Sequence, residues 1–84
     1  MPYEVEITPE GLRHLNRLPE KIRAVVLEAI FGSIAENPQR AGKQLRSELE
    51  GLYSARRGEF RVIYEIDEAA RLVLVHRAQH RRSA

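Results

Sequence analysis

Arginine and histidine are concentrated in the last part of the chain, where their types and spacing suggest chemistry on a phosphate. The 84 residues include 14 Lys and Arg, 12 Asp and Glu and three His, with a formal net charge of +2. From Arg71 onward the sequence has four arginines, two histidines and no acid. A basic face in one half of a small protein indicates a polyanionic partner, or an acidic protein that competes for the same face.

One pair of arginines is predicted to face each other across a hairpin. A two-residue turn at Gly58-Glu59 would place Arg57 opposite Phe60 and Arg56 opposite Arg61. Two cations directly opposite each other destabilise a hairpin unless an anion lies between or above them. The alternative is that these guanidinium groups extend into solvent or pair with nearby glutamates, because exposed charges often contribute little.

Further basic residues follow or end the last predicted strand, which neighbours the middle strand in a meander, so they can converge with Arg61. They are Arg77, His80, Arg81 and Arg82. Clustered guanidinium groups suit a phosphodiester, because their planar forks hold the non-bridging oxygens and stabilise the charge of a pentacovalent transition state. In RNA the 2′-hydroxyl supplies the nucleophile, so a protein without a nucleophilic side chain can still cleave the chain.

Cleavage also needs a group that accepts and donates a proton. Arginine is a poor proton carrier because it stays charged at ordinary pH. The alternatives are His80, His76, Glu59 and Glu65, although a histidine near a basic terminus is more often an ordinary surface residue. Lys43 follows Gly42 without the glycine spacing of a P-loop, so we expect a structural role or a supplementary phosphate contact.

Several classes of site are excluded or disfavoured by composition. The chain has no Cys, which excludes disulfides, thiolate nucleophiles, thiolate zinc sites and iron–sulfur clusters. The three histidines show no metal-binding spacing, so we expect no metal and no cofactor. No apolar run approaches the ~20 residues of a membrane span, and the first residues do not resemble a signal peptide, so we expect no membrane contact and a cytoplasmic location.

The first half of the chain predicts a strand and two helices. Apolar and polar residues alternate over 3–7, which is the period of a strand with one buried face. Thr8-Pro9 is a helix start, and Pro19 ends that helix or begins another. The second helix, with its apolar stripe of Ile22, Val25, Val26, Ala29, Ile30 and Ile34, ends at Asn37-Pro38.

The second half predicts three strands after a polar connection. Residues 39–51 are expected to connect the two halves, with a helical turn near Gln44–Leu49. Strands are expected over 52–57, 60–66 and 72–78, with alternate residues such as Tyr64 in the core rather than stacked on a base. The predicted fold is α+β and one domain over 1–84: an N-terminal strand, a two-helix hairpin and an antiparallel three-strand meander, with the helices on one face of a single sheet.

The sequence resembles the RelE/ParE superfamily of bacterial toxin–antitoxin systems, and within it the RelE branch. The most specific segment is 51–67, which contains Arg56 and Arg61. It is preceded by Gly42-Lys43-Gln44-Leu45 and followed by the segment 75–81.

The resemblance implies a RelE-like fold and a toxin that enters the ribosomal A site and cleaves messenger RNA there by 2′-hydroxyl attack, without a metal. It also implies a cognate RelB-like antitoxin. The toxin would contact operator DNA only through that antitoxin. The catalytic residues that the resemblance implies are Arg56, Arg61 and Arg81. From the charge pattern we expect His80 as a proton-transfer group, and Lys43, Arg57, Arg77 and Arg82 as RNA-binding residues.

The sequence departs from the better-studied RelE toxins at two places. Ser54 stands where they have a second basic residue, and the tyrosine expected a few residues beyond Arg81 is absent. Either this branch works without that tyrosine or the chain is shortened. If the sequence is complete, His80 gains importance for proton transfer. Two other functions stay open: a ParE-like toxin that inhibits DNA gyrase without cleaving RNA, and a protein whose basic face only binds an acidic antitoxin.

Overall fold

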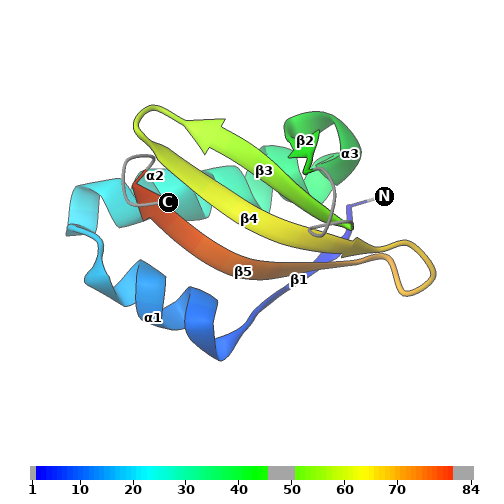
Figure 1. Cartoon of the computed structure of the whole chain (residues 1–84), viewed down its shortest axis with the longest axis horizontal. Helices are drawn as coiled ribbons and strands as arrows, with labels where there is room; N and C mark the ends of the chain where they lie inside the picture. The colour runs from blue at the N-terminus through cyan, green and yellow to red at the C-terminus, as the bar shows by residue number, and fades with distance from the viewer. Residues whose placement is uncertain (1, 46–50, 81–84) are drawn as a thin grey trace.

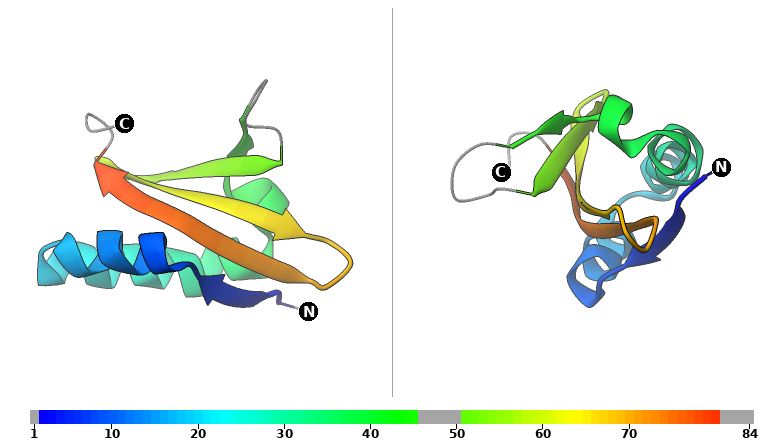
Figure 2. Two further views of the ribbon diagram at one scale, coloured as in Figure 1. Left: turned by 60° about the horizontal axis from the view of Figure 1, so that its bottom comes forward. Right: turned by 90° about the vertical axis from the view of Figure 1, so that its right-hand side faces the viewer.

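The chain forms a five-stranded sheet with its helices packed on one face (Figures 1 and 2). A computed structural model describes residues 2–45 and 51–80. The strand order is β1-β5-β4-β3-β2, in which β1 and β5 are parallel and the other pairs are antiparallel. The predicted α+β fold is confirmed.

The first strand leads directly into a helix that lies along β5. Strand β1 (Glu4–Ile7) pairs with the start of β5 (Leu72–His80). Thr8 accepts a hydrogen bond from the Gly11 amide and Pro9 occupies the first turn of α1 (Pro9–Arg17), as the sequence predicted. Helix α1 then packs against the part of β5 that extends beyond β1.

The second helix crosses beneath the strands and changes pitch midway. It runs as α2 (Glu20–Ala29) and continues through a π-helical segment η1 (Ile30–Ile34). Ile30 and Ile34 are fully buried, but Val25 is 53% exposed. The expectation that Val25 belongs to the buried stripe is therefore wrong, because the side of the helix that carries it faces away from the sheet.

Two short elements stand where the sequence predicted only a connection. Helix α3 (Pro38–Ala41) follows Asn37, and strand β2 (Lys43–Gln44) pairs with β3. The helical turn expected from Gln44 is wrong at that residue, which lies in a strand. The rest of the expected turn, from residue 46, lies outside the described residues.

The meander has the predicted strands and one irregularity. Strands β3 (Leu52–Arg57) and β4 (Phe60–Asp67) are joined by a two-residue turn in which Gly58 has a φ of +58°, a value that favours glycine. Between β4 and β5 the register shifts next to Ile63 and Tyr64, which leaves His76 as an extra residue on β5.

The core lies between the helices and one face of the sheet. Its largest fully buried side chains include Tyr64, Ile30, Ile34 and Val26. The Tyr64 hydroxyl donates a 2.7 Å hydrogen bond to the Pro38 carbonyl, and desolvation by burial raises the pKa of Tyr64 to about 12. The prediction that Tyr64 belongs to the core is confirmed.

Candidate functional site

Side chains on the sheet face opposite the helices, the outer face, form rows across the strands. Because side chains alternate along a strand, every second residue of β3 and β4 lies on this face. Arg56 pairs directly with Arg61, as the two-residue turn predicted, and Arg61 pairs with Gln79 of β5. The first row therefore places two guanidinium groups side by side at the hairpin end of the sheet.

A second row lies one step further along the strands. It consists of Lys43, Ser54, Ile63 and Arg77, each paired with the next. The bulge at His76 determines the position of Arg77: strict alternation from the buried Val73 and Val75 would turn Arg77 towards the core. The extra residue instead puts Arg77 on the outer face, where it is predominantly exposed.

These rows border a cleft of about 690 Å³, which we call the basic cleft. Its lining contains four cationic residues and no acid among the described residues: Arg40, Lys43, Arg56 and Arg61. The cleft thus combines the predicted residues Lys43, Arg56 and Arg61 with Arg40, which sequence reasoning missed. Arg40 is brought there by α3, a single helical turn whose start at Asn37-Pro38 was interpreted only as a stop signal.

Arg61, at the hairpin end of the outer face, has an unsatisfied donor. Its Nε atom is buried and has no hydrogen-bond partner among the described residues. A buried donor without a partner costs free energy, and an oxygen atom of a bound ligand would satisfy it. This makes the Arg61 guanidinium a candidate anion-binding group.

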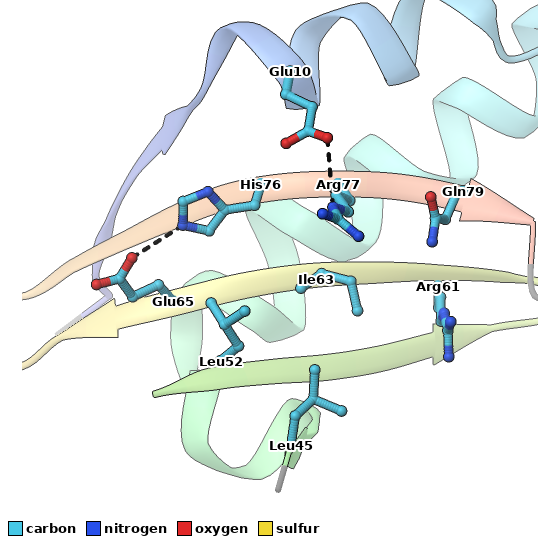
Figure 3. A pocket seen from close by; sticks show the side chains of 9 residues that line it. All are labelled: Glu10, Leu45, Leu52, Arg61, Ile63, Glu65, His76, Arg77 and Gln79. Atoms are coloured by element: carbon cyan, nitrogen blue, oxygen red, sulfur yellow. Dashed lines mark hydrogen bonds and ion pairs between the residues drawn. The ribbon is translucent and has the colours of Figure 1, made fainter. Parts of the chain in front are cut away.

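A second cleft of about 550 Å³, the amphipathic cleft, adjoins the first and shares Arg61 and Leu45 with it (Figure 3). At one end, His76 Nε2 lies 3.0 Å from Glu65 Oε1. Beside it, Glu10 of α1 points towards Arg77, with Glu10 Oε2 at 3.5 Å from Arg77 Nε. Arg77, predicted to contact RNA, therefore carries an intramolecular anionic partner.

Two predicted site residues lie on the other face of the sheet. Arg57 pairs with Phe60, and its guanidinium donates to the Ser33 hydroxyl of η1. His80 also pairs with Phe60, contacts its ring edge-on and lies 3.3 Å from Glu59 Oε1. The structure does not bring Arg57 or His80 together with Arg56 and Arg61.

The remaining predicted residues, Arg81 and Arg82, lie outside the described residues. Over residues 2–45 and 51–80, no group of three His, Asp or Glu side chains is placed to hold a metal ion. No helix in this part of the chain is both long and apolar enough to cross a membrane. The guanidinium and ammonium groups of the basic cleft can bind anionic oxygens.

Comparison with known proteins identifies relatives over nearly the whole length. Residues 5–84 match the family model described as the ParE toxin of type II toxin–antitoxin system. The chain is 54% identical over 84 residues to Toxin RelE of Mycobacterium tuberculosis, covering 99% of this chain and 84% of that protein. It is 46% identical over 81 residues to Toxin RelG of the same organism, covering 96% and 93% of the two chains.

Solved structures agree with this relationship. The structure is similar to a chain of the RelBE2 toxin–antitoxin complex of M. tuberculosis, with a TM-score of 0.93 and 44% identity over 96% of this chain and 93% of that one. It is also similar to the isolated RelE toxin of E. coli, with a TM-score of 0.78 and 17% identity over 93% and 83% of the two chains. The second likeness shows that the fold is shared.

Proposed function

The chain belongs to the RelE/ParE superfamily of toxins from type II toxin–antitoxin systems, and from this premise we propose that it is a ribosome-dependent endoribonuclease that cleaves messenger RNA in the A site. The observation that carries the proposal is the direct pairing of Arg56 with Arg61 in a cleft where the described lining residues include four cations and no acid. Such a surface repels itself until a polyanion occupies it. The relatives at 54% and 46% identity are named Toxin RelE and Toxin RelG, which favours this function over gyrase inhibition.

In the proposed reaction the RNA supplies its own nucleophile. The 2′-hydroxyl gives up its proton to a base as its oxygen bonds to the adjacent phosphorus. The bond from phosphorus to the 5′-oxygen breaks and that oxygen takes up a proton from an acid, so the products carry a 2′,3′-cyclic phosphate and a 5′-hydroxyl. Arg56 and Arg61 would hold the two non-bridging oxygens and stabilise the charge of the transition state. Lys43 and Arg40 would hold the neighbouring backbone.

Further roles in the proposal rest on the family resemblance and on the charge pattern of the sequence. The resemblance suggests Arg81 as a third guanidinium for the transition state. The charge pattern suggests that Arg82 and Arg77 contact the RNA and that His80 transfers a proton. His80 and Arg57 lie on the opposite face of the sheet from Arg61. To act on the RNA, they would have to reach it around the hairpin end of the sheet, because the basic cleft is on the other face. These roles remain predictions.

We also propose a RelB-like antitoxin as the protein partner, acting with the toxin in the cytoplasm. Several structures similar to this chain are toxin–antitoxin complexes, among them the RelBE2 complex and the RelB–RelE complex of Methanococcus jannaschii. Contact with operator DNA would come only through that antitoxin. Coexpression with the antitoxin should relieve growth arrest caused by the toxin alone.

The deciding experiment is primer extension on a defined messenger in a purified translation system, with and without ribosomes. We expect cuts within A-site codons that require ribosomes and decrease about 100-fold or more in Arg61→Ala, since removing one transition-state donor typically costs that much. Lys21→Ala removes a cation from α2, behind the opposite face of the sheet, and should cleave normally. Absence of cleavage by the wild type would reject the proposal, and a gyrase supercoiling assay on the same preparation would then test the ParE-like alternative.

A further inference from the structure

A strip of apolar side chains crosses the outer face, outside the hydrophobic core. Ile63 is only 7% exposed, yet it lies on the face opposite the helices and does not belong to the core cluster. Leu45 and Leu52 lie beside it in the amphipathic cleft and are partly buried. Figure 3 shows the three side chains together between Arg61 at one end and the pair of Glu65 and His76 at the other.

This apolar strip is unusual for its position. A sheet covered by helices on one face normally presents polar side chains on its open face. The stems of arginines can shield some apolar surface, but the cleft above the strip stays open at about 550 Å³. The strip would therefore suit a flat apolar group that belongs to an anionic ligand of the outer face.

A nucleobase of a bound RNA has these properties. The amphipathic cleft shares Arg61 and Leu45 with the basic cleft, so a strand held there by its phosphates passes directly over the strip. Arg61 on β4 and Arg77 on β5 are offset by two residues along neighbouring strands, so their Cα atoms lie about 8 Å apart, which is comparable to the distance between successive phosphates of an extended strand. A base between two such phosphates would contact the partly exposed Leu45 and Leu52 beside Ile63.

We propose that Leu45, Leu52 and Ile63 form a nucleobase subsite, which receives the base next to the phosphate held in the basic cleft. The proposal rests on the proposed endoribonuclease function and adds a determinant of sequence preference. The face of the base packs on the apolar strip, as bases do on other flat side-chain surfaces. The arginines at its border hold the flanking phosphates.

The polar end of the strip selects among bases. The Glu65 carboxylate accepts a hydrogen bond from the His76 ring when Nε2 carries the proton, and its second oxygen, Oε2, stays available as an acceptor. A carboxylate acceptor pairs with the exocyclic amino groups of cytosine, adenine or guanine, which uracil lacks. Glu65 should therefore favour codons with an amino-bearing base at the subsite.

The test is to map cleavage on a messenger library in the purified translation system, at all codons and for matched variants. Glu65→Gln should reduce the preference for amino-bearing bases from about tenfold to about threefold or less, the effect of one lost specific contact. Glu36→Gln, an exposed change outside both clefts, should leave the ranking of codons unchanged. Leu52→Thr should raise the KM about fivefold at all codons, because the base loses its apolar contact.

Each outcome bears on the proposal in a defined way. If the wild type does not cleave, the endoribonuclease function fails and the subsite fails with it. If the wild type cleaves and Glu65→Gln keeps the same ranking of codons, only the subsite is rejected. If Leu52→Thr changes neutralisation by antitoxin but neither KM nor ranking, the strip docks a protein and the subsite is also rejected. Thermal melting of each variant excludes loss of folding as the cause.

Discussion

The pairing of Arg56 with Arg61 shows how much a short turn determines about a site. Gly58 at the first turn position fixes a two-residue loop, and that loop length sets the register of the two strands. The meeting of the two arginines was predicted from the sequence. The same register turns Arg57 to the other face, although Arg57 was expected to contact RNA. The position of His80 did not follow, because the last strand was expected to end at residue 78 and instead continues to His80.

The opposed arginines should lower stability in the free protein. We predict that Arg56→Thr raises the free energy of unfolding by about 0.5 kcal/mol, because it removes a like-charge pair and threonine suits a strand. The same change should reduce RNA cleavage. Urea denaturation measures the change in the free energy of unfolding. Arg77→Thr is the matched control. Because Arg77 has Glu10 as a partner, replacing Arg77 should not stabilise the protein.

The buried Tyr64 hydroxyl predicts a dependence of stability on alkaline pH. Its pKa is about 12 in the folded protein and near the ordinary value of 10.0 when unfolded. Ionisation therefore favours the unfolded chain: this contribution to stability is complete below pH 10 and is lost as the pH rises towards 12. Urea denaturation from about pH 8 to pH 11 should show the loss in the wild type and in Tyr53→Phe.

The variant Tyr64→Phe is the control for that titration. Its free energy of unfolding should be about 1 to 2 kcal/mol lower than that of the wild type at neutral pH, because the Pro38 carbonyl loses its buried donor. Its remaining stability should then fall less steeply above pH 10. An equal alkaline loss in Tyr64→Phe would mean that another group is responsible.

Among the secondary-structure elements, the long ones were predictable and the short ones were not. Helices α1 and α2 have apolar periodicity and clear start signals, and β3, β4 and β5 have turns between them. Helix α3 and strand β2 are too short for any periodicity to mark them. The bulge at His76 is a single extra residue in a regular ladder, and it alone brings Arg77 to the outer face.

The contact of α1 with β5 depends on the absence of a side chain at Gly11. A Cβ atom there would lie 2.6 Å from the Val75 carbonyl oxygen, whereas a Cβ atom at Gly32 would meet nothing within 4 Å. We predict that Gly11→Ala destabilises the protein by about 2 kcal/mol or more, because helix and strand must move apart. Gly32→Ala should be neutral or stabilise it by up to about 1 kcal/mol, because alanine is the better helix residue. Thermal or urea denaturation of both variants tests this, and equal effects would contradict it.

In the molecule as a whole, the two faces of the sheet have different roles. One face packs against the helices and the other presents the basic cleft. The order of strand, helices and meander predicted this layering, because amphipathic helices in a small domain must cover a sheet. The apolar strip on the outer face was not predicted, since the alternation around Ile63 does not distinguish a core position from a binding position.

Binding of RNA by the outer face should depend steeply on salt. Among the described residues, the cations on this face are Arg40, Lys43, Arg56, Arg61 and Arg77. Four or five phosphate contacts on a single strand give a slope of log K against log salt of about −3. Fluorescence anisotropy with a 2′-O-methyl oligonucleotide, which cannot be cleaved, measures this slope. Lys43→Ala should reduce its magnitude by about 0.7, whereas a slope unchanged in that variant would remove Lys43 from the contact surface.

The parallel pairing of β1 with β5 also has a consequence for the order of folding. Thr8 and Val75, which form hydrogen bonds at this junction, are 67 residues apart in the sequence. Contacts between such distant residues form late, because a long loop must close first. Since β5 also carries Arg77 and Gln79, the residues up to 79 must leave the ribosome before the amphipathic cleft can form. A shorter nascent chain therefore cannot present this cleft.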